Sequence, residues 1–229
     1  MKRATTAAAW DRVDVMIAPD PDALGHLLSL FDLAPAEGDA FIGQSLDLGF
    51  RNLFGGHILG QSLMAAALTC GGRGAHSLHA YFLRGGDAQQ PVHYQVDRIR
   101  DGNSFSVRRV TASQHGKAIL ILSASFQAAE PGFEHQLAMP EVPPPEGLQP
   151  FIDGVRPQPS TSGRKIASGR AIDIRPVPAA ALHGAACAGE PIQAVWLRAA
   201  GAEPATPALH RALLAYASDF ARLSTAMLP

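Results

Sequence analysis

Apolar residues recur at helical spacing in two segments of the first half of the chain. In residues 21–33 the apolar side chains fall three or four positions apart, after an Asp20-Pro21 start that suits a helix beginning. In FGGHILGQSLMAAALTCGG, residues 54–72, glycine pairs flank an Ala-rich apolar run. This run predicts a helix of about four turns that is buried on most sides.

Strand-like patterns surround the second of these helices. Residues 43–50 and 76–83 are short and rich in apolar or β-branched residues. Residues 92–127 are divided by the turn dipeptides Asp101-Gly102 and His115-Gly116 into three such runs, which predicts an antiparallel meander. A long helix followed by an antiparallel sheet indicates an α+β fold in which the sheet curls around the helix.

The second half begins like the first half and is shorter. Prolines crowd residues 131–163, which predicts an extended linker. Strand-like runs follow at 171–177 and 192–199, and then Thr206-Pro207 opens a helix, with threonine as the N-cap. About 60 residues after the linker are too few to repeat what about 90 residues build before it. We therefore expect the second unit to be incomplete.

These patterns divide the chain into four parts. They are an N-terminal extension (1–20), a first domain (21–127), a Pro-rich linker (128–170) and a partial second domain (171–229).

Composition and charge exclude several classes of function. The chain has 229 residues, 47% of them hydrophobic and 17% charged, with a net charge of −1 and no basic stripe. Nucleic acid and anionic membrane surfaces are therefore not expected partners. No apolar run approaches the roughly 20 residues of a membrane span. Cys70 and Cys187 are too few for a disulfide framework and lack metal-ligand spacing, which favours a cytoplasmic location.

Asp219 is the candidate with the clearest chemistry. On a helical wheel the apolar residues Leu213, Tyr216 and Phe220 share one stripe, and Asp219 falls on its shoulder. A partly buried carboxylate is suited to accept a proton from water, as a hydrolase requires. The alternative is a surface ion pair with Arg222, three residues further along.

The other candidates are weaker. Gly55 and Gly56 precede the long helix, where exposed backbone N–H groups could polarise a carbonyl oxygen; close packing of helix on strand is the alternative. His57 and His76 are candidate substrate-binding residues. His76 and His79 are predicted on opposite faces of one strand, where a structural role is the commoner one. The serines lack a G-x-S-x-G elbow, and GGHILG lacks the spacing of a phosphate-binding G-x-G-x-x-G loop.

Several stretches carry a family resemblance. They are GQSLDLGFRNLFGGHILGQSL, HSLHAYFLRGGD, VDRIRDGNSFSVRRVTASQHGK, SASFQ and FEHQLAMP in the first half, and RPV, VWLRA and HRALLAYASDF in the second. The chain resembles the acyl-CoA thioesterase II family, which carries two hot-dog domains in one polypeptide. The resemblance implies a double hot-dog, with a curved antiparallel sheet around a long helix, whose second copy is incomplete here.

The resemblance also implies an activity and its residues. It implies hydrolysis of medium- or long-chain fatty acyl-CoA to free acid and CoA, with no cofactor or metal, and it assigns Asp219 as the catalytic residue. His57 stands where the family more often has glutamine. The family's threonine and glutamine partners of the aspartate would lie beyond residue 229. The alternative is therefore a catalytically impaired acyl-CoA-binding protein, and hydration of an enoyl thioester is a weaker one. Open strand edges favour a homo-oligomer.

Overall fold

The helices and strands follow the sequence pattern closely. The structure, a computed structural model, describes residues 22–47, 52–150, 171–178, 181, 192–201 and 206–220. In chain order the elements are α1 (Ala23–Ser29), β1 (Ala34–Pro35), β2 (Ala40–Gly43), α2 (Gly55–Leu68), β3 (Gly74–Phe82), β4 (Val92–Asp101), β5 (Phe105–Gln114), β6 (Lys117–Gln127), the 3-10 turn η1 (Pro145–Gly147), β7 (Ile172–Pro176), β8 (Val195–Ala199) and α3 (Pro207–Ala217).

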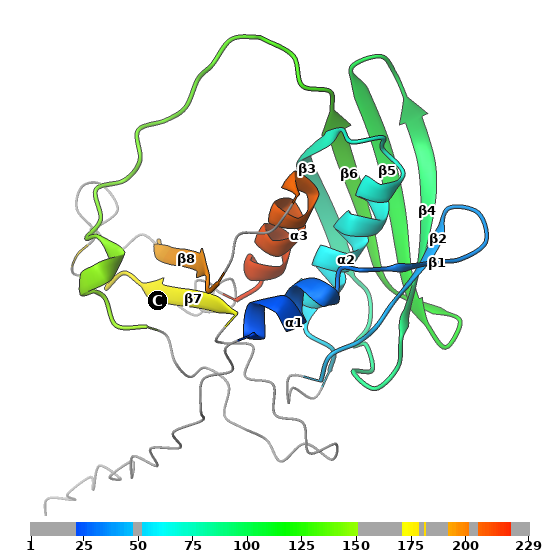
Figure 1. Cartoon of the computed structure of the whole chain (residues 1–229), viewed down its shortest axis with the longest axis horizontal. Helices are drawn as coiled ribbons and strands as arrows, with labels where there is room; N and C mark the ends of the chain where they lie inside the picture. Colours follow the sequence, from blue (N-terminus) through cyan, green and yellow to red (C-terminus); the bar gives the residue numbers. More distant parts are fainter. Residues whose placement is uncertain are drawn as a thin grey trace, which may run out of the picture.

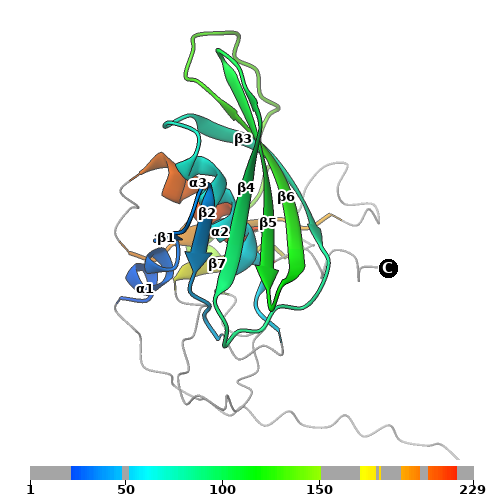
Figure 2. The same cartoon turned by 90° about the vertical axis from the view of Figure 1, so that its right-hand side faces the viewer.

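The main sheet contains the predicted meander. Its strand order is β1-β2-β4-β5-β6-β3, and every neighbouring pair is antiparallel. His115 and Gly116 have φ of 50° and 71°, so they form the tight turn between β5 and β6. Strand β3 precedes the meander in the chain and pairs with β6, its last strand, which makes β3 the edge strand opposite β1. Figures 1 and 2 show the curved sheet with α2 and α3 on one side of it.

The long helix α2 is enclosed from two directions, as its uniform hydrophobicity predicts. Ten of its 14 residues are buried. The sheet covers one side, where Leu59, Leu63 and Ala66 join the core formed by β4, β5 and β6. Helix α3 covers another side. Gly60 makes the helices' close approach possible, because a Cβ there would lie 2.9 Å from the backbone oxygen of Ala212.

The carboxyl end of α2 is closed by a buried arginine from β5. The side chain of Arg108 is only 1% exposed. Its Nη2 donates to the Thr69 carbonyl oxygen at 3.0 Å and to Asp101 Oδ1 at 2.7 Å. Because the helix dipole is negative at this end, the guanidinium is favourably placed.

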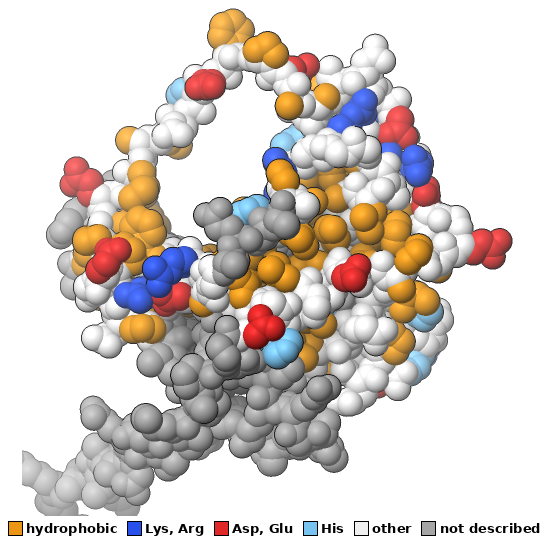
Figure 3. All heavy atoms as spheres, viewed as in Figure 1, with side chains coloured by type: hydrophobic (Ala, Val, Ile, Leu, Met, Phe, Trp, Pro, Cys, Tyr) orange, Lys and Arg blue, Asp and Glu red, His pale blue; other side chains and the backbone are white. Residues whose placement is uncertain are grey.

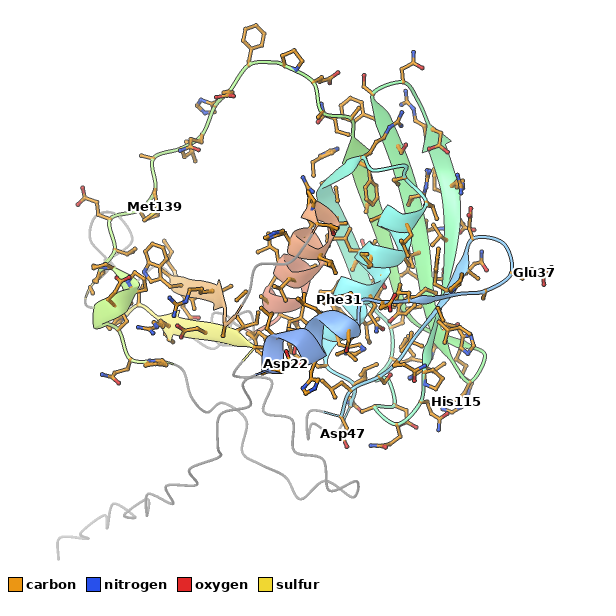
Figure 4. The ribbon with its side chains drawn as sticks, in the orientation of Figure 1. Asp22, Phe31, Glu37, Asp47, His115 and Met139 are labelled. Carbon is orange, nitrogen blue, oxygen red and sulfur yellow. The ribbon has the colours of Figure 1, made fainter. Side chains whose placement is uncertain are left out.

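A second apolar cluster joins the two ends of the chain. It contains Leu24 and Leu27 of α1, Ile172 and Ile174 of β7, and Leu213 of α3. Strand β7 pairs with β8 in a separate two-stranded sheet. The predicted N-cap of α3 is confirmed, since the Leu209 N–H donates to Thr206 Oγ1 at 3.3 Å. Figure 4 shows Phe31 at the end of α1, beside α2.

One sequence prediction, the strand at 43–50, needs correction. The strand predicted at 43–50 is wrong for 44–47, since β2 ends at Gly43. The backbone oxygen of Gln44 accepts from the side chains of His57 and Gln61, and it is therefore not available to a strand ladder. Residues 48–50 lie outside the described residues.

The linker is extended where the structure describes it. Residues 128–144 run without regular structure to η1, in an arch that stands away from the sheet and carries Met139 (Figure 4). Residues 1–20 and 151–170 lie outside the described residues. Within the part of the chain that the structure describes, no helix is long and apolar enough to cross a membrane.

Candidate active site

The structure brings Asp219 to the amino end of α2. The Gly56 N–H donates to Asp219 Oδ2 at 2.9 Å, across 163 residues of sequence. Asp219 is partly exposed. It does not lie on the helix, as the wheel assumed, because α3 ends at Ala217 and Ser218 is its C-cap. Leaving the helix allows the carboxylate to turn towards α2. Arg222, its alternative partner, lies outside the described residues.

The two glycines leave room for this approach. A Cβ on Gly55 would lie 2.6 Å from Asp219 Oδ2, and a Cβ on Gly56 would lie 2.2 Å from the Tyr216 backbone oxygen. Real Cβ atoms do not approach other atoms so closely, so any side chain at either position would push α3 or the carboxylate away. The glycine pair therefore lets α3 and the carboxylate pack closely against α2. That its backbone N–H groups polarise a carbonyl oxygen stays a prediction.

The electrostatics of α2 favour an anion at this position. The N-cap residue Phe54 gives the helix no side-chain cap, and the first turn contains no acidic residue. Among the described side chains, only the Asp219 carboxylate accepts a hydrogen bond from the backbone N–H groups at this end of α2. It also lies at the positive end of the helix dipole. The negative charge that is absent from the first turn of α2 is supplied by Asp219, which is 163 residues away from Gly56 in the sequence.

An aromatic cluster holds the two helix ends together. The ring of Phe54 lies 5.2 Å from that of Tyr216 and 4.8 Å from that of Phe220. Tyr216 and Phe220 also contact each other edge-to-face, at 5.5 Å. These rings flank Asp219 in sequence, so their packing fixes the direction in which the carboxylate leaves α3. The sequence analysis missed Phe54, which stands just before the glycine pair.

Phe82 is a second aromatic residue that the sequence analysis missed. It ends β3, and its Cε1 would lie 2.9 Å from a Cβ on Gly55. The same point is 2.6 Å from Asp219 Oδ2, so the ring and the carboxylate flank one glycine. Phe82 is 51% exposed. The alternation of Leu78, Ala80 and Phe82 in HSLHAYFL was the available signal.

His57 lies inside the fold and not beside the carboxylate. It is buried, and its Nε2 lies 3.0 Å from the Gln44 carbonyl oxygen, to which it donates. Burial lowers the pKa of this imidazole from 6.5 to about 4, because a charged ring would lose its hydration. The neighbouring Gln61 donates to the same oxygen and accepts from the Tyr94 hydroxyl. A substrate-binding role for His57 stays a prediction.

His76 lies on the other side of the sheet. A β-bulge between Ala75 and Ser77 makes His76 an extra residue, and its Nε2 reaches Ser125 Oγ at 2.9 Å. It therefore shares the outer face with His79, and the prediction of opposite faces is wrong. Asp219 is on the inner side, with α2. The structure thus brings together Asp219, Gly55 and Gly56, and leaves both histidines apart from them.

Other described clusters do not compete with this site. No three His, Cys, Asp or Glu side chains gather as metal ligands among the described residues. A pocket of about 260 Å³ lies between η1 and the β7–β8 pair. Its charged side chains Arg175 and Arg198 are already paired with Asp173, and it contains none of the predicted site residues.

Comparison with known proteins gives the family. Residues 46–127 match the family model described as the acyl-CoA thioesterase N-terminal domain. Human acyl-coenzyme A thioesterase 8 is 42% identical over 214 residues, which cover 88% of this chain and 67% of the human protein. The crystal structure of the acyl-CoA thioesterase II TesB2 from Mycobacterium marinum superposes with a TM-score of 0.71 at 40% identity, covering 88% of this chain and 71% of that one.

A more distant structure shares the fold alone. It is a protein from Alicyclobacillus acidocaldarius described as having a hot-dog fold, with a TM-score of 0.63 at 20% identity over 83% of this chain and 68% of that one. The α+β hot-dog arrangement predicted from the sequence is therefore confirmed. From its sequence, its fold and these relatives, the chain belongs to the acyl-CoA thioesterase II family.

Proposed function

We propose that this protein hydrolyses medium- or long-chain fatty acyl-CoA to the free fatty acid and CoA, with Asp219 as the general base. The observation that carries the proposal is the 2.9 Å hydrogen bond from the Gly56 N–H to Asp219 Oδ2. It joins an acidic side chain to the amino end of a helix, which is the combination that acyl transfer to water uses.

The hydrogen bond gives the two carboxylate oxygens different roles. Oδ2 is held by Gly56, while Oδ1 accepts no hydrogen bond from the described residues. Oδ1 can therefore accept a proton from a water molecule beside it. Since Oδ2 cannot rotate away without losing its donor, the base is held in one orientation, which favours attack from one direction.

The reaction proceeds by addition and elimination. The water oxygen bonds to the thioester carbonyl carbon as its proton passes to Asp219, and the carbonyl oxygen becomes an oxyanion. The Gly55 N–H has no acceptor among the described residues and lies at the positive end of α2, where it can stabilise that charge. The C–S bond then breaks, and the proton held by Asp219 passes to the departing CoA sulfur.

The test replaces the base and keeps its shape. In Asp219→Asn we expect kcat on lauroyl-CoA to fall by roughly 10²-fold or more, because the amide cannot accept the proton. CoA release is followed with a thiol reagent. The matched control is Asp97→Asn, which removes a carboxylate from an exposed ion pair with Arg109 on the outer face and should leave kcat unchanged.

Two outcomes would contradict the proposal in different ways. Activity of Asp219→Asn within three-fold of wild type would remove Asp219 from the mechanism. Tight binding of lauroyl-CoA by the wild-type protein without any release of CoA would favour the alternative function, an acyl-CoA-binding protein.

A further inference from the structure

Gln114, the last residue of β5, is a buried polar side chain that the proposed mechanism does not use. It is only 4% exposed. Its Nε2 donates to the backbone oxygens of Asp87 and Gln90, at 2.9 and 2.8 Å, and its Oε1 accepts from the Asp87 N–H at 2.7 Å. All three hydrogen bonds go to residues 83–91, which connect β3 to β4. We call this segment the β3–β4 loop.

The β3–β4 loop supports the residues that lead into α2. The Gly86 backbone oxygen accepts from the Leu53 N–H at 2.8 Å. A Cβ on Gly86 would lie 3.2 Å from both Leu53 Cβ and Gln114 Oε1, so Gly86 lies between these two side chains with little room to spare. Leu53 is buried, and it directly precedes Phe54, the N-cap of α2. The position of the amino end of α2 therefore depends on the loop.

The same loop begins beside another part of the candidate active site. It follows Phe82 directly, and the Phe82 ring approaches Gly55. The loop also binds the side chain of Asp47, in the segment before α2, through a hydrogen bond of 2.8 Å. In Figure 4, Asp47 lies towards the same end of the sheet as His115, the residue after Gln114. One loop thus joins β3 to the chain that enters α2, and these two elements meet at Gly55.

Hydrogen bonds are well suited to fix this end of α2. Figure 3 shows hydrophobic side chains over the centre of one face of the molecule, across α2 and α3. Hydrophobic contacts are non-directional, whereas a hydrogen bond constrains both a distance and an angle. A displacement of about 1 Å between reacting groups can lower a rate by roughly 10²-fold. The three hydrogen bonds of Gln114 are therefore placed where precision affects the reaction.

We propose that Gln114 is a positioning residue, which holds the β3–β4 loop against Leu53 and thereby sets the distance between the Gly56 N–H and the Asp219 carboxylate. This inference rests on the proposed function and adds a residue to its site. Among the described residues, Gln114 makes no hydrogen bond to Asp219 or to the glycine pair. Its effect reaches them through the loop and the backbone that runs from Leu53 to Gly56.

The first test is Gln114→Met, which keeps the length of the side chain and removes all three hydrogen bonds. We expect kcat on lauroyl-CoA to fall by at least roughly ten-fold, with KM within about two-fold of wild type, at a temperature where both proteins are folded. The matched control is Thr69→Val at the other end of α2, which removes a buried hydroxyl that accepts from Arg108 Nε at 2.8 Å. It should lower Tm similarly and leave kcat unchanged.

A second variant perturbs the loop and keeps Gln114. In Gly86→Ala the new Cβ requires Leu53 or Gln114 to move by a few tenths of an ångström, so kcat should fall by roughly three- to ten-fold. The matched control is Gly102→Ala in the β4–β5 turn. Its Cβ would be similarly crowded, at 3.3 Å from the Phe105 backbone oxygen, and kcat should not change.

Two further measurements separate positioning from general destabilisation. In an Asp219→Asn background, Gln114→Met should change kcat by less than about three-fold, because the geometry that Gln114 maintains no longer orients a base. Amide hydrogen exchange needs no turnover. The Gly56 N–H should exchange at least roughly ten-fold faster in Gln114→Met than in wild type, and at the wild-type rate in Thr69→Val.

Several results would overturn the inference. They are an unchanged kcat in Gln114→Met and Gly86→Ala, losses from Gln114→Met and Asp219→Asn that multiply in the double variant, or equal Gly56 exchange in wild type and Gln114→Met. If Gln114→Met did not fold, kcat and Gly56 exchange in Gly86→Ala would decide. If the wild type released no CoA, or Asp219→Asn kept its activity, the proposed function would fail instead, and amide exchange alone would decide whether Gln114 holds the end of α2.

Discussion

The buried imidazole of His57 makes the stability of the protein depend on pH between about 4 and 6.5. Its pKa is about 4 in the folded protein and 6.5 in an unfolded chain. Between these two pH values His57 is protonated in the unfolded chain and neutral in the folded protein. The free energy of unfolding therefore keeps its full value above pH 6.5, as far as His57 is concerned, and decreases as the pH falls towards 4.

The magnitude follows from the two pKa values. The full difference of about 2.5 units corresponds to about 3.4 kcal/mol, and about 2 kcal/mol of it is lost between pH 7 and pH 5. That is a large fraction of the 5–15 kcal/mol by which domains are typically stable. The carboxyls of Asp39 and Asp101 have pKa values lowered by Arg98 and Arg108, so they take up protons only below this window.

The assay is urea unfolding at pH 7 and pH 5, with the midpoint and slope compared between proteins. His57→Gln removes the titrating ring and keeps an N–H that can reach the Gln44 oxygen. We expect the wild type to lose about 2 kcal/mol more than His57→Gln on acidification. His79→Gln, a change to an exposed ring on the outer face, should behave as the wild type does. Equal pH dependence in wild type and His57→Gln would refute the reasoning.

Two further predictions concern the glycine pair and the sheet edge. Gly55→Ala should lower kcat by roughly ten-fold with little change in Tm, since its Cβ meets only the movable ends of two side chains. Gly56→Ala should lower the free energy of unfolding by about 1–3 kcal/mol, since its Cβ meets the fixed backbone oxygen of Tyr216. Scanning calorimetry distinguishes the two variants, and similar Tm values for Gly55→Ala and Gly56→Ala would contradict this account. Because β3 has one edge unpaired among the described strands and carries exposed apolar side chains, we expect dimers or larger species in light scattering at micromolar concentration. A monomer throughout that range would count against it.

The elements that the sequence predicted are those whose signals are local. Thr206-Pro207 caps a helix by contacts within one turn, and His115-Gly116 turns a hairpin through its own backbone angles. The α2 helix is flanked by glycines and is uniformly apolar, which is enough to predict both its limits and its burial.

The errors arose where distant contacts override local pattern. The strand predicted at 43–50 ends at Gly43 because side chains from α2 bind the Gln44 oxygen. The helical stripe continues to Phe220 although α3 ends at Ala217, because that ring packs on Phe54 from the other half of the chain. The β-bulge at His76 changes the face of the sheet on which this residue lies, and the residue types around it do not predict a bulge. Asp219 and Gly56 were separate candidates in the sequence, and the hydrogen bond between them became evident only in three dimensions.

The 163-residue separation between Gly56 and Asp219 has a consequence for synthesis of the protein. At 5–20 residues per second, a ribosome needs roughly 10–30 s to add the carboxylate after the helix end that receives it. The β4–β5–β6 meander joins neighbouring segments, so it can fold well within that delay. We therefore expect a nascent chain with its first sheet in place and the amino end of α2 still without its anion. The orientation of Asp219 on which the proposed hydrolysis depends would then be acquired late, in the step that docks α3.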